Sequence, residues 1–242
     1  MKNTIIIMSL ALLSLVVGCT PSSIQVNIKD SRSERSSASV RELKLYRNDS
    51  LIRIINPVQR NRHVIDSLRS GNYRIEYTSI FNKTEGVHVK IKKGKKYYVD
   101  LFVDYINHEL ETYNPIINRL QDGESFSIDF SSRGCFHYST EEMKIRRESD
   151  KYFVEYKDKE KILSKDDVEA IRHFEIELNY MNSSGCTTTD TYTIFHRAGL
   201  VMIFDGSCRW RGLYYLKKKL NLIEDKRKKH FPKDLSSLYN PK

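Results

Sequence analysis

The sequence lacks the short motifs that identify several classes of enzyme. Its ten glycines are scattered, and they form no glycine-rich loop of the kind that holds phosphate or a dinucleotide. No Cys-x-x-Cys or His-Glu-x-x-His pattern occurs, and His-Glu-Leu-Glu at residues 108–111 is a weak cluster for a metal. Adjacent acids such as Glu141 and Glu142 point to opposite faces of a strand. We therefore expect a protein without a catalytic residue, a metal or a cofactor, that is, not an enzyme.

Long apolar runs are also lacking, apart from one at the N-terminus. Residues 5–18 follow the positive Lys2 and form an apolar run of 14 residues, whereas a membrane-spanning helix needs roughly 20. This layout is typical of a secretory signal. The run ends in Leu-Val-Val-Gly-Cys at residues 15–19, which resembles the lipobox of bacterial lipoproteins. The resemblance implies that residues 1–18 are a cleaved signal peptide and that Cys19 is acylated, for example with palmitate.

The residues after Cys19 suit an anchored, exported protein. Residues 19–39 are rich in serine and arginine, a composition typical of a flexible tether. No aspartate follows Cys19, so the pattern that retains some lipoproteins in the inner membrane is absent. We expect lipid anchoring in the outer membrane, facing the periplasm or the cell surface.

The net charge of +10 comes mainly from the C-terminal end. Residues 225–242 form a basic tail, preceded by three lysines, Lys217 to Lys219, which are expected in solvent near a helix C-terminus where cations are favoured. The alternative is contact with anionic lipid or a polyanionic envelope glycan. Export argues against a nucleic-acid partner.

Residues 24–105 predict an all-β sandwich. Apolar residues alternate with polar ones in several short segments, which is the period of a strand with one buried face. Six or seven strands are expected, and the turn at Lys93-Gly94 predicts a hairpin between its flanking strands. The segments are Ile24/Val26/Ile28, Leu43/Leu45, Tyr73/Ile75/Tyr77 and Val87/Val89/Ile91.

Part of this region resembles the transthyretin-like or carboxypeptidase-regulatory-like sandwich. That family recurrently shows a leucine, a turn with glycine and an aromatic strand, matched here by Leu68, Gly71 and Tyr73; Ser70 stands where the family often has proline. The resemblance implies a spacer or a binding platform without catalytic residues.

A linker is predicted at residues 106–122, because Pro115 interrupts a weak helical pattern. Residues 123–224 then predict an α+β domain, an antiparallel sheet with two helices on one face and the order β-β-β-α-β-β-α. Ser164 and Asp167 have the spacing of a capping box at the start of the first helix.

A strand pair and a second helix complete this domain. Residues 200–205, Leu-Val-Met-Ile-Phe-Asp, are apolar on both faces, which predicts a strand buried on both sides. Gly199 is expected to take a positive φ at the preceding turn. The second helix is indicated by Trp210, Leu213 and Leu216. The motifs of this domain, among them Gly-Cys-Thr-Thr-Thr at residues 185–189, resemble those of uncharacterised envelope lipoproteins.

Three cysteines remain after Cys19. The midpoint of Cys186 and Cys208 is residue 197, inside the predicted turn, so these two face each other across a hairpin and are expected to form a disulfide. The alternative pairs Cys135 with one of them. If Cys135 is free, it is either a buried structural residue or a reactive thiol activated by Arg133 and His137.

These features favour a non-enzymatic lipoprotein that binds an envelope protein or a polyanionic glycan. Two alternatives stay open. One is a periplasmic inhibitor or immunity protein, and the other is a thiol-dependent enzyme that uses Cys135.

Overall fold

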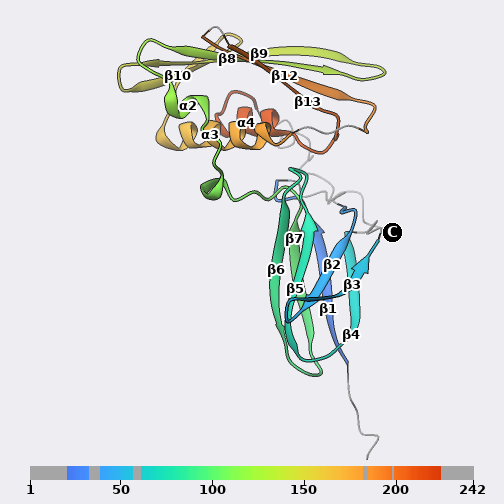
Figure 1. Ribbon diagram of the computed structural model, residues 1–242. Helices are drawn as coiled ribbons and strands as arrows, with labels where there is room; N and C mark the ends of the chain where they lie inside the picture. The colour runs from blue at the N-terminus through green and yellow to red at the C-terminus, as the bar shows by residue number, and fades with distance from the viewer. Residues whose placement is uncertain (1–20, 33–38, 57–60, 182–184, 198, 225–242) are drawn as a thin grey trace, which may run out of the picture. The chain divides into compact units, whose positions relative to one another are not determined.

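The computed structural model describes residues 21–32, 39–56, 61–181, 185–197 and 199–224. The chain divides into two units, the first ending at Ile106 and the second beginning at Asn107. Strands dominate the described part of each unit (Figure 1), so the mostly β content that the sequence predicted is confirmed. Cys19 and the basic tail lie outside the described residues, and predictions about them stay predictions.

Two sheets make up the first unit. One has the order β4-β1-β7, in which β1 pairs antiparallel with β4 and parallel with β7. The other has the order β3-β2-β5-β6 and is antiparallel throughout. The strands are β1 (Ser22–Lys29), β2 (Leu43–Arg47), β3 (Ser50–Ile55), β4 (Arg62–Leu68), β5 (Gly71–Thr78), β6 (Thr84–Ile91) and β7 (Lys96–Phe102).

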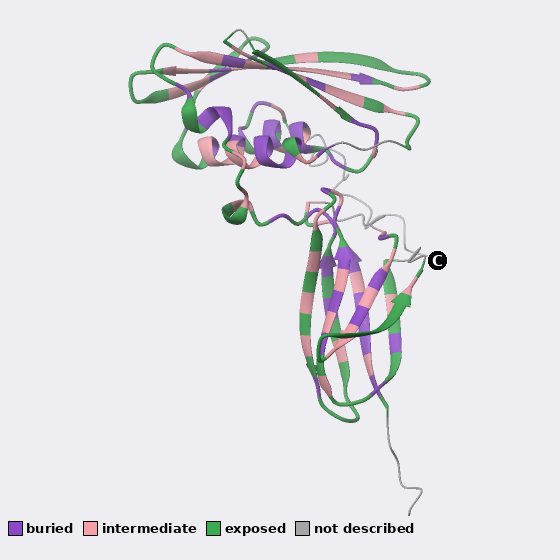
Figure 2. Cartoon of the chain, in the orientation of Figure 1, coloured by how far each residue is buried: buried purple, intermediate pink, exposed green. Residues whose placement is uncertain are grey.

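The two sheets share one apolar core. Alternate residues of a strand point to the same side of the sheet, and those that the sequence pattern singled out, such as Ile24, Val26, Leu45 and Ile75, are completely buried in one cluster. Figure 2 shows this alternation of buried and exposed positions along the strands. The first unit is therefore sandwich-like.

The predicted hairpin around Lys93-Gly94 is wrong. Gly94 does take a positive φ of 73°, but the flanking strands β6 and β7 belong to different sheets. Strand β7 instead pairs in parallel with β1, with Val26 opposite Val99. A turn residue shows where the chain reverses direction, but it does not show which sheet the next strand joins.

The second unit contains a six-stranded antiparallel sheet with the order β11-β10-β9-β8-β12-β13. Four strands precede the long helix, where the sequence predicted three, because the short β11 follows β10 directly. The strands are β8 (Ser125–Arg133), β9 (Tyr138–Glu148), β10 (Lys151–Tyr156), β11 (Lys159–Ile162), β12 (Thr189–His196) and β13 (Gly199–Asp205).

Three α-helices, α2 (Ile116–Arg119), α3 (Lys165–Asn179) and α4 (Gly212–Lys219), lie on one face of this sheet (Figure 1). The predicted capping box opens α3: the Ser164 hydroxyl accepts a hydrogen bond from the Asp167 N–H, and the Asp167 carboxylate accepts one from the Ser164 N–H. Within the described ranges, no helix has both the length and the hydropathy needed to cross a bilayer.

Most of the segment predicted as a linker packs in the second unit. It contains the 3₁₀ turn η2 (His108–Leu110) and α2, and α2 packs on α3. Ile116, Ile117 and Leu120 are buried. The short distance between Pro115 and the end of α2 leaves too few residues for a clear helical period, which is why the sequence did not reveal this element.

Strand β13 is not buried on both sides, as its composition predicted. It is the edge strand of the sheet, and Leu200, Val201, Met202 and Phe204 are each about half exposed. The turn before it also differs from the prediction, because Arg197, with φ of 54°, takes the left-handed conformation that was expected of Gly199.

Candidate functional site

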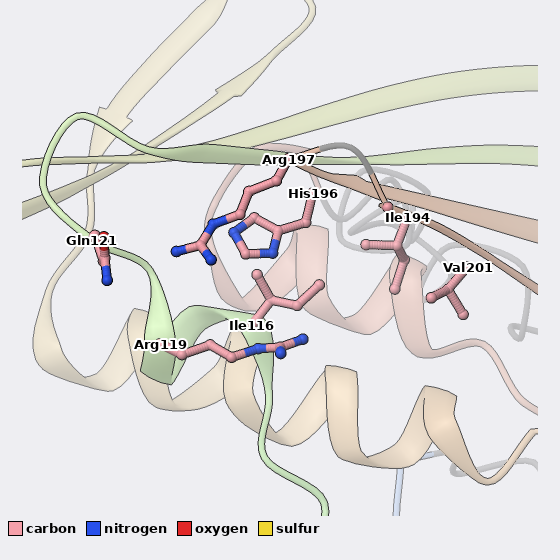
Figure 3. A pocket seen from close by; sticks show the side chains of 8 residues that line it. Ile116, Arg119, Gln121, Ile194, His196, Arg197 and Val201 are labelled. Carbon is pink, nitrogen blue, oxygen red and sulfur yellow. The ribbon is translucent and has the colours of Figure 1, made fainter.

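A pocket of about 530 Å³ opens between α2 and the turn end of the β12–β13 hairpin. Figure 3 shows Ile194, His196 and Arg197 projecting from the hairpin towards Ile116 and Arg119 of α2. The residues that line the pocket are Ile116, Arg119, Gln121, Ile194, His196, Arg197, Gly199 and Val201.

A buried acid holds the α2 side of the pocket in place. The Glu175 carboxylate accepts hydrogen bonds from the backbone N–H groups of Ile116, at 2.6 Å, and Ile117, at 3.0 Å. Burial raises the pKa of Glu175 to about 7, although these two hydrogen bonds and the charge of Arg119 oppose the shift. Glu175 therefore fixes the start of α2, from which Ile116 contributes an apolar side chain to the pocket.

Two arginines line the pocket. Arg119 lies in the last turn of α2, is exposed, and forms no ion pair within the described part of the chain. Arg197 is held by Glu124, whose carboxylate accepts from Arg197 Nε at 2.8 Å and from the Gln121 N–H at 2.8 Å. These two bonds, the one from Arg197 first, lower the pKa of Glu124. Glu124 thus organises one side of the rim as an anion.

His196 has an unused hydrogen-bonding atom in the pocket. Its side chain is only 12% exposed, and its buried Nε2 has no hydrogen-bond partner among the described residues. A Glu124 carboxylate oxygen lies 3.8 Å from this nitrogen, which is too far for a hydrogen bond. Buried polar atoms are usually paired, so this nitrogen is an exception among the described residues.

The lining combines apolar and basic side chains. Its apolar part, which includes Ile116 and Ile194, lies beside two arginines and a histidine, and none of the lining residues is a serine, threonine, cysteine or acid. A nucleophile with an oriented base is therefore not provided by these side chains. Pockets of a few hundred Å³ with apolar walls and a few polar groups are typical of sites for small organic molecules.

The two predicted disulfide partners lie together. The Cα atoms of Cys186 and Cys208 are 5.9 Å apart, within disulfide distance. The short distance between the two cysteines follows from the register of the β12–β13 hairpin, in which Asp190 faces Asp205. The Cys186 N–H donates to the Gly206 carbonyl, which continues this alignment beyond the strands.

Cys135 is exposed, so the expectation of a buried structural cysteine is wrong. It lies in the turn between β8 and β9, where no strand covers it. His137, one of the two residues predicted to activate its thiol, instead has Nε2 within 3.0 Å of the Ser132 hydroxyl. This contact engages one ring nitrogen of His137, and the role of Cys135 as a reactive thiol stays a prediction.

A second cluster of ionisable groups joins η2 to α3. The rings of His108 and His173 are stacked with centroids 3.8 Å apart, and His173 is half-buried. The position of His173 off the apolar stripe of its helix had favoured a histidine in solvent. Burial, and then the neighbouring His108, lower the pKa of His173. The buried Glu177 accepts from Trp210 Nε1 at 2.9 Å and lies 3.2 Å from His108 Nε2.

Ligand atoms of Glu109, Glu169 and His173 lie within 4.8 Å of one another, a spacing that could hold a metal ion. However, Glu169 already binds Arg172 at 2.7 Å and His173 at 2.8 Å, and Glu109 lies 3.7 Å from Arg172. Arg172 and His173 thus already engage the carboxylates of this cluster. We assign the cluster to holding η2 against α3.

Sequence reasoning missed the pocket. Its cations are isolated arginines in Asn-Arg-Leu at residues 118–120 and His-Arg-Ala at residues 196–198, and single surface arginines are common. They become neighbours only because α2 packs under the β12–β13 hairpin. No local pattern in the sequence carries that information.

The fold is that of a mostly β protein of two units, one of which has a pocket lined by apolar and basic side chains. No protein-family model matches the chain, and no match is found among curated proteins.

Proposed function

We propose that the second unit binds an organic anion with an apolar body. The observation that carries this proposal is the His196 Nε2 without a hydrogen-bond partner among the described residues, in a pocket with apolar walls that Arg119 also lines. A carboxylate would accept hydrogen bonds from both side chains, and charge-assisted bonds of this kind contribute about 1.5 to 3 kcal/mol each. The apolar part of the ligand would lie on Ile116, Ile194 and Val201.

We also propose that the protein is a non-enzymatic bacterial lipoprotein, anchored in the outer membrane through acylated Cys19. The lipobox at residues 15–19 supports this proposal. In this arrangement the first unit is a transthyretin-like sandwich that acts as a spacer or platform, and the second is an α+β domain that carries the binding site. A disulfide between Cys186 and Cys208 is consistent with an oxidising envelope.

Titration calorimetry with hexanoate tests the binding proposal. We expect the purified full-length chain to bind hexanoate, and Arg119→Gln to weaken binding about tenfold, which corresponds to about 1.4 kcal/mol. Arg53→Gln is the matched control, because Arg53 is an exposed arginine in β3 of the first unit. Hexylamine, which has the same tail and the opposite charge, should not bind.

Equal affinity of the wild type and Arg119→Gln for hexanoate would contradict the proposed site. The fluorescence of Trp210, the only tryptophan, reports whether the second unit of each variant is folded. A variant that binds weakly but retains the native fluorescence supports the proposal.

Metabolic labelling with radioactive palmitate tests the anchor. We expect Cys19→Ala to abolish the label and to release the protein from the membrane fraction. The control, Cys135→Ala, removes an exposed cysteine and should remain labelled. Unchanged membrane association of Cys19→Ala would refute the anchor.

A further inference from the structure

Strand β13 is an unprotected edge of the six-stranded sheet. In the described ranges it pairs with β12 alone, and an edge strand presents a row of unpaired N–H and C=O groups. Residues 199–204 include no charged residue and no proline, the features that commonly protect such edges. The opposite edge strand, β11, has only four residues, three of which are charged. Another strand can therefore add at β13.

The side chains of β13 are apolar on both faces of this edge. Successive residues of a strand point to opposite sides, so Leu200, Met202 and Phe204 share one face and Val201 points to the other. Each is between 48% and 54% exposed. The side chains of an added strand would lie beside those of β13 on both faces of the sheet. Residues 200–204 are all apolar, so they suit being covered in this way.

The cations of the pocket lie at one end of β13. Gly199 and Val201, at its start, line the pocket together with His196 and the two cations, Arg119 and Arg197. A strand that added in parallel would bring its amino-terminal end to these cations. A strand that added antiparallel would bring its carboxyl-terminal end there instead, so charge favours the antiparallel orientation.

We propose that β13 and the adjacent pocket together bind the C-terminal segment of another polypeptide. The segment lies extended and antiparallel along β13, and its terminal carboxylate binds Arg119 and His196. This assignment rests on the proposed function, because it names the class of anion that the pocket takes. Strand addition provides main-chain hydrogen bonds, and alternate side chains and the captured carboxylate provide specificity.

The β13 strand of a second copy of the chain fits this edge and the pocket less well than a polypeptide C-terminus does. Self-pairing of β13 would place apolar residues opposite each other, but it would bring an internal stretch of chain, and no terminal carboxylate, to the pocket. A polypeptide C-terminus is the occupant that uses both features.

Fluorescence anisotropy with a labelled hexapeptide tests the inference. The probe alternates threonine and valine and ends in valine with a free carboxylate, and a second probe carries a C-terminal amide. We expect the free acid to bind the full-length chain at least tenfold more tightly than the amide. Met202→Lys should weaken binding at least tenfold, because an edge lysine disfavours strand addition. Ile162→Lys on β11, where Ile162 is similarly exposed, should leave binding unchanged.

The outcomes separate this inference from the proposed function. If hexanoate binds at Arg119 but the two peptides bind equally or Met202→Lys has no effect, the pocket stands and strand addition is refuted. If neither hexanoate nor peptide binds, both proposals fail. If the peptide does not bind and Met202→Lys converts a dimer to a monomer in sedimentation, the edge serves a second copy and the inference is overturned.

Discussion

The two units bury different kinds of side chain. The first unit has an almost entirely apolar core, and Asp104 is the only residue with a full charge among its buried described residues. The second unit buries Asp167, Glu175, Glu177, Asp205 and Lys217 beneath or beside its helices. Burying a charge requires partners that compensate for lost hydration. We infer that the second unit depends on pH and on specific polar contacts far more than the first.

This difference follows from how the layers are held together. In the first unit, the two sheets meet mainly through a cluster of apolar side chains. In the second unit, hydrogen bonds to buried acids of α3 hold the two shorter helices in place. The Glu175 carboxylate accepts from the first residue of α2, and the Glu177 carboxylate accepts from Trp210, which precedes α4. Charged groups thus position the helix that carries half of the pocket.

Removing apolar volume from the first unit should have the largest effect. Leu45 is fully buried, and Leu45→Ala should lower the free energy of unfolding of this unit by about 4 kcal/mol at any pH between 5 and 8. Urea unfolding followed by circular dichroism would measure the loss. The unfolding transition seen by Trp210 fluorescence should not move; an equal shift would show that the two units unfold together.

Glu175→Gln should remove a pH dependence from the second unit. The pKa of Glu175 is about 7 in the folded state and near its ordinary value in the unfolded chain, so the folded state binds more protons. The contribution of Glu175 to the free energy of unfolding is greatest below the unfolded pKa. It falls by about 3 kcal/mol as the pH rises to about 7.

Unfolding curves of wild type and Glu175→Gln, recorded by Trp210 fluorescence from pH 4.5 to 7.5, would measure this difference. The exposed Glu142 gives the control Glu142→Gln, which should follow the wild type. Parallel curves for wild type and Glu175→Gln would rule out the raised pKa.

Loss of the proposed disulfide should destabilise the second unit. Cys186 and Cys208 are separated by 22 residues, and a bridge of this span contributes about 3 kcal/mol in the chain-entropy model. We expect Cys186→Ser with Cys208→Ser to lower the thermal midpoint of the Trp210 transition under oxidising conditions, while a reducing agent should lower that of the wild type similarly. Cys135→Ser is the control and should have no effect.

Lys217→Met should have the smallest effect of the four. Lys217 is buried and pairs with Glu141, which also accepts from the Tyr156 hydroxyl at 2.7 Å. Although burial alone would raise the pKa of Glu141, its bonds with Lys217 and Tyr156 lower it. Without Lys217 the carboxylate loses its cation, which should cost about 2 kcal/mol, less than for a fully buried pair because Glu141 is partly exposed.

Adding Glu141→Gln to Lys217→Met should restore much of this stability, measured by the same fluorescence. Lys219→Met removes an exposed lysine of the same helix and should change little. A lack of rescue would show that the packing of the lysine stem matters more than its charge.

The lysine run near the helix C-terminus was predicted to be in solvent; Lys217 departs from that prediction because its position on α4 faces the sheet.

The sequence predicted elements better than partners. Alternation located β1, β2, β5 and β6, and the capping box located the start of α3, because both signals depend on neighbours within one segment. The partner of β7 and the edge position of β13 depend on contacts between distant segments. The buried roles of Glu175 and Glu177 were missed for the same reason, since an acid on a helix is usually in solvent.

By itself the sequence determined the mostly β content, the faces of the strands and the hairpin that brings Cys186 near Cys208. Only the tertiary structure decided that α2 and the β12–β13 hairpin line one pocket, that Arg119 and His196 both face it, and that an apolar strand is an edge of the sheet among the described residues. Local patterns set which side of each element is apolar, whereas packing decides which sides meet. The pocket lies where residues of α2 and of the β12–β13 hairpin face each other, and one of its polar atoms, His196 Nε2, has no hydrogen-bond partner among the described residues.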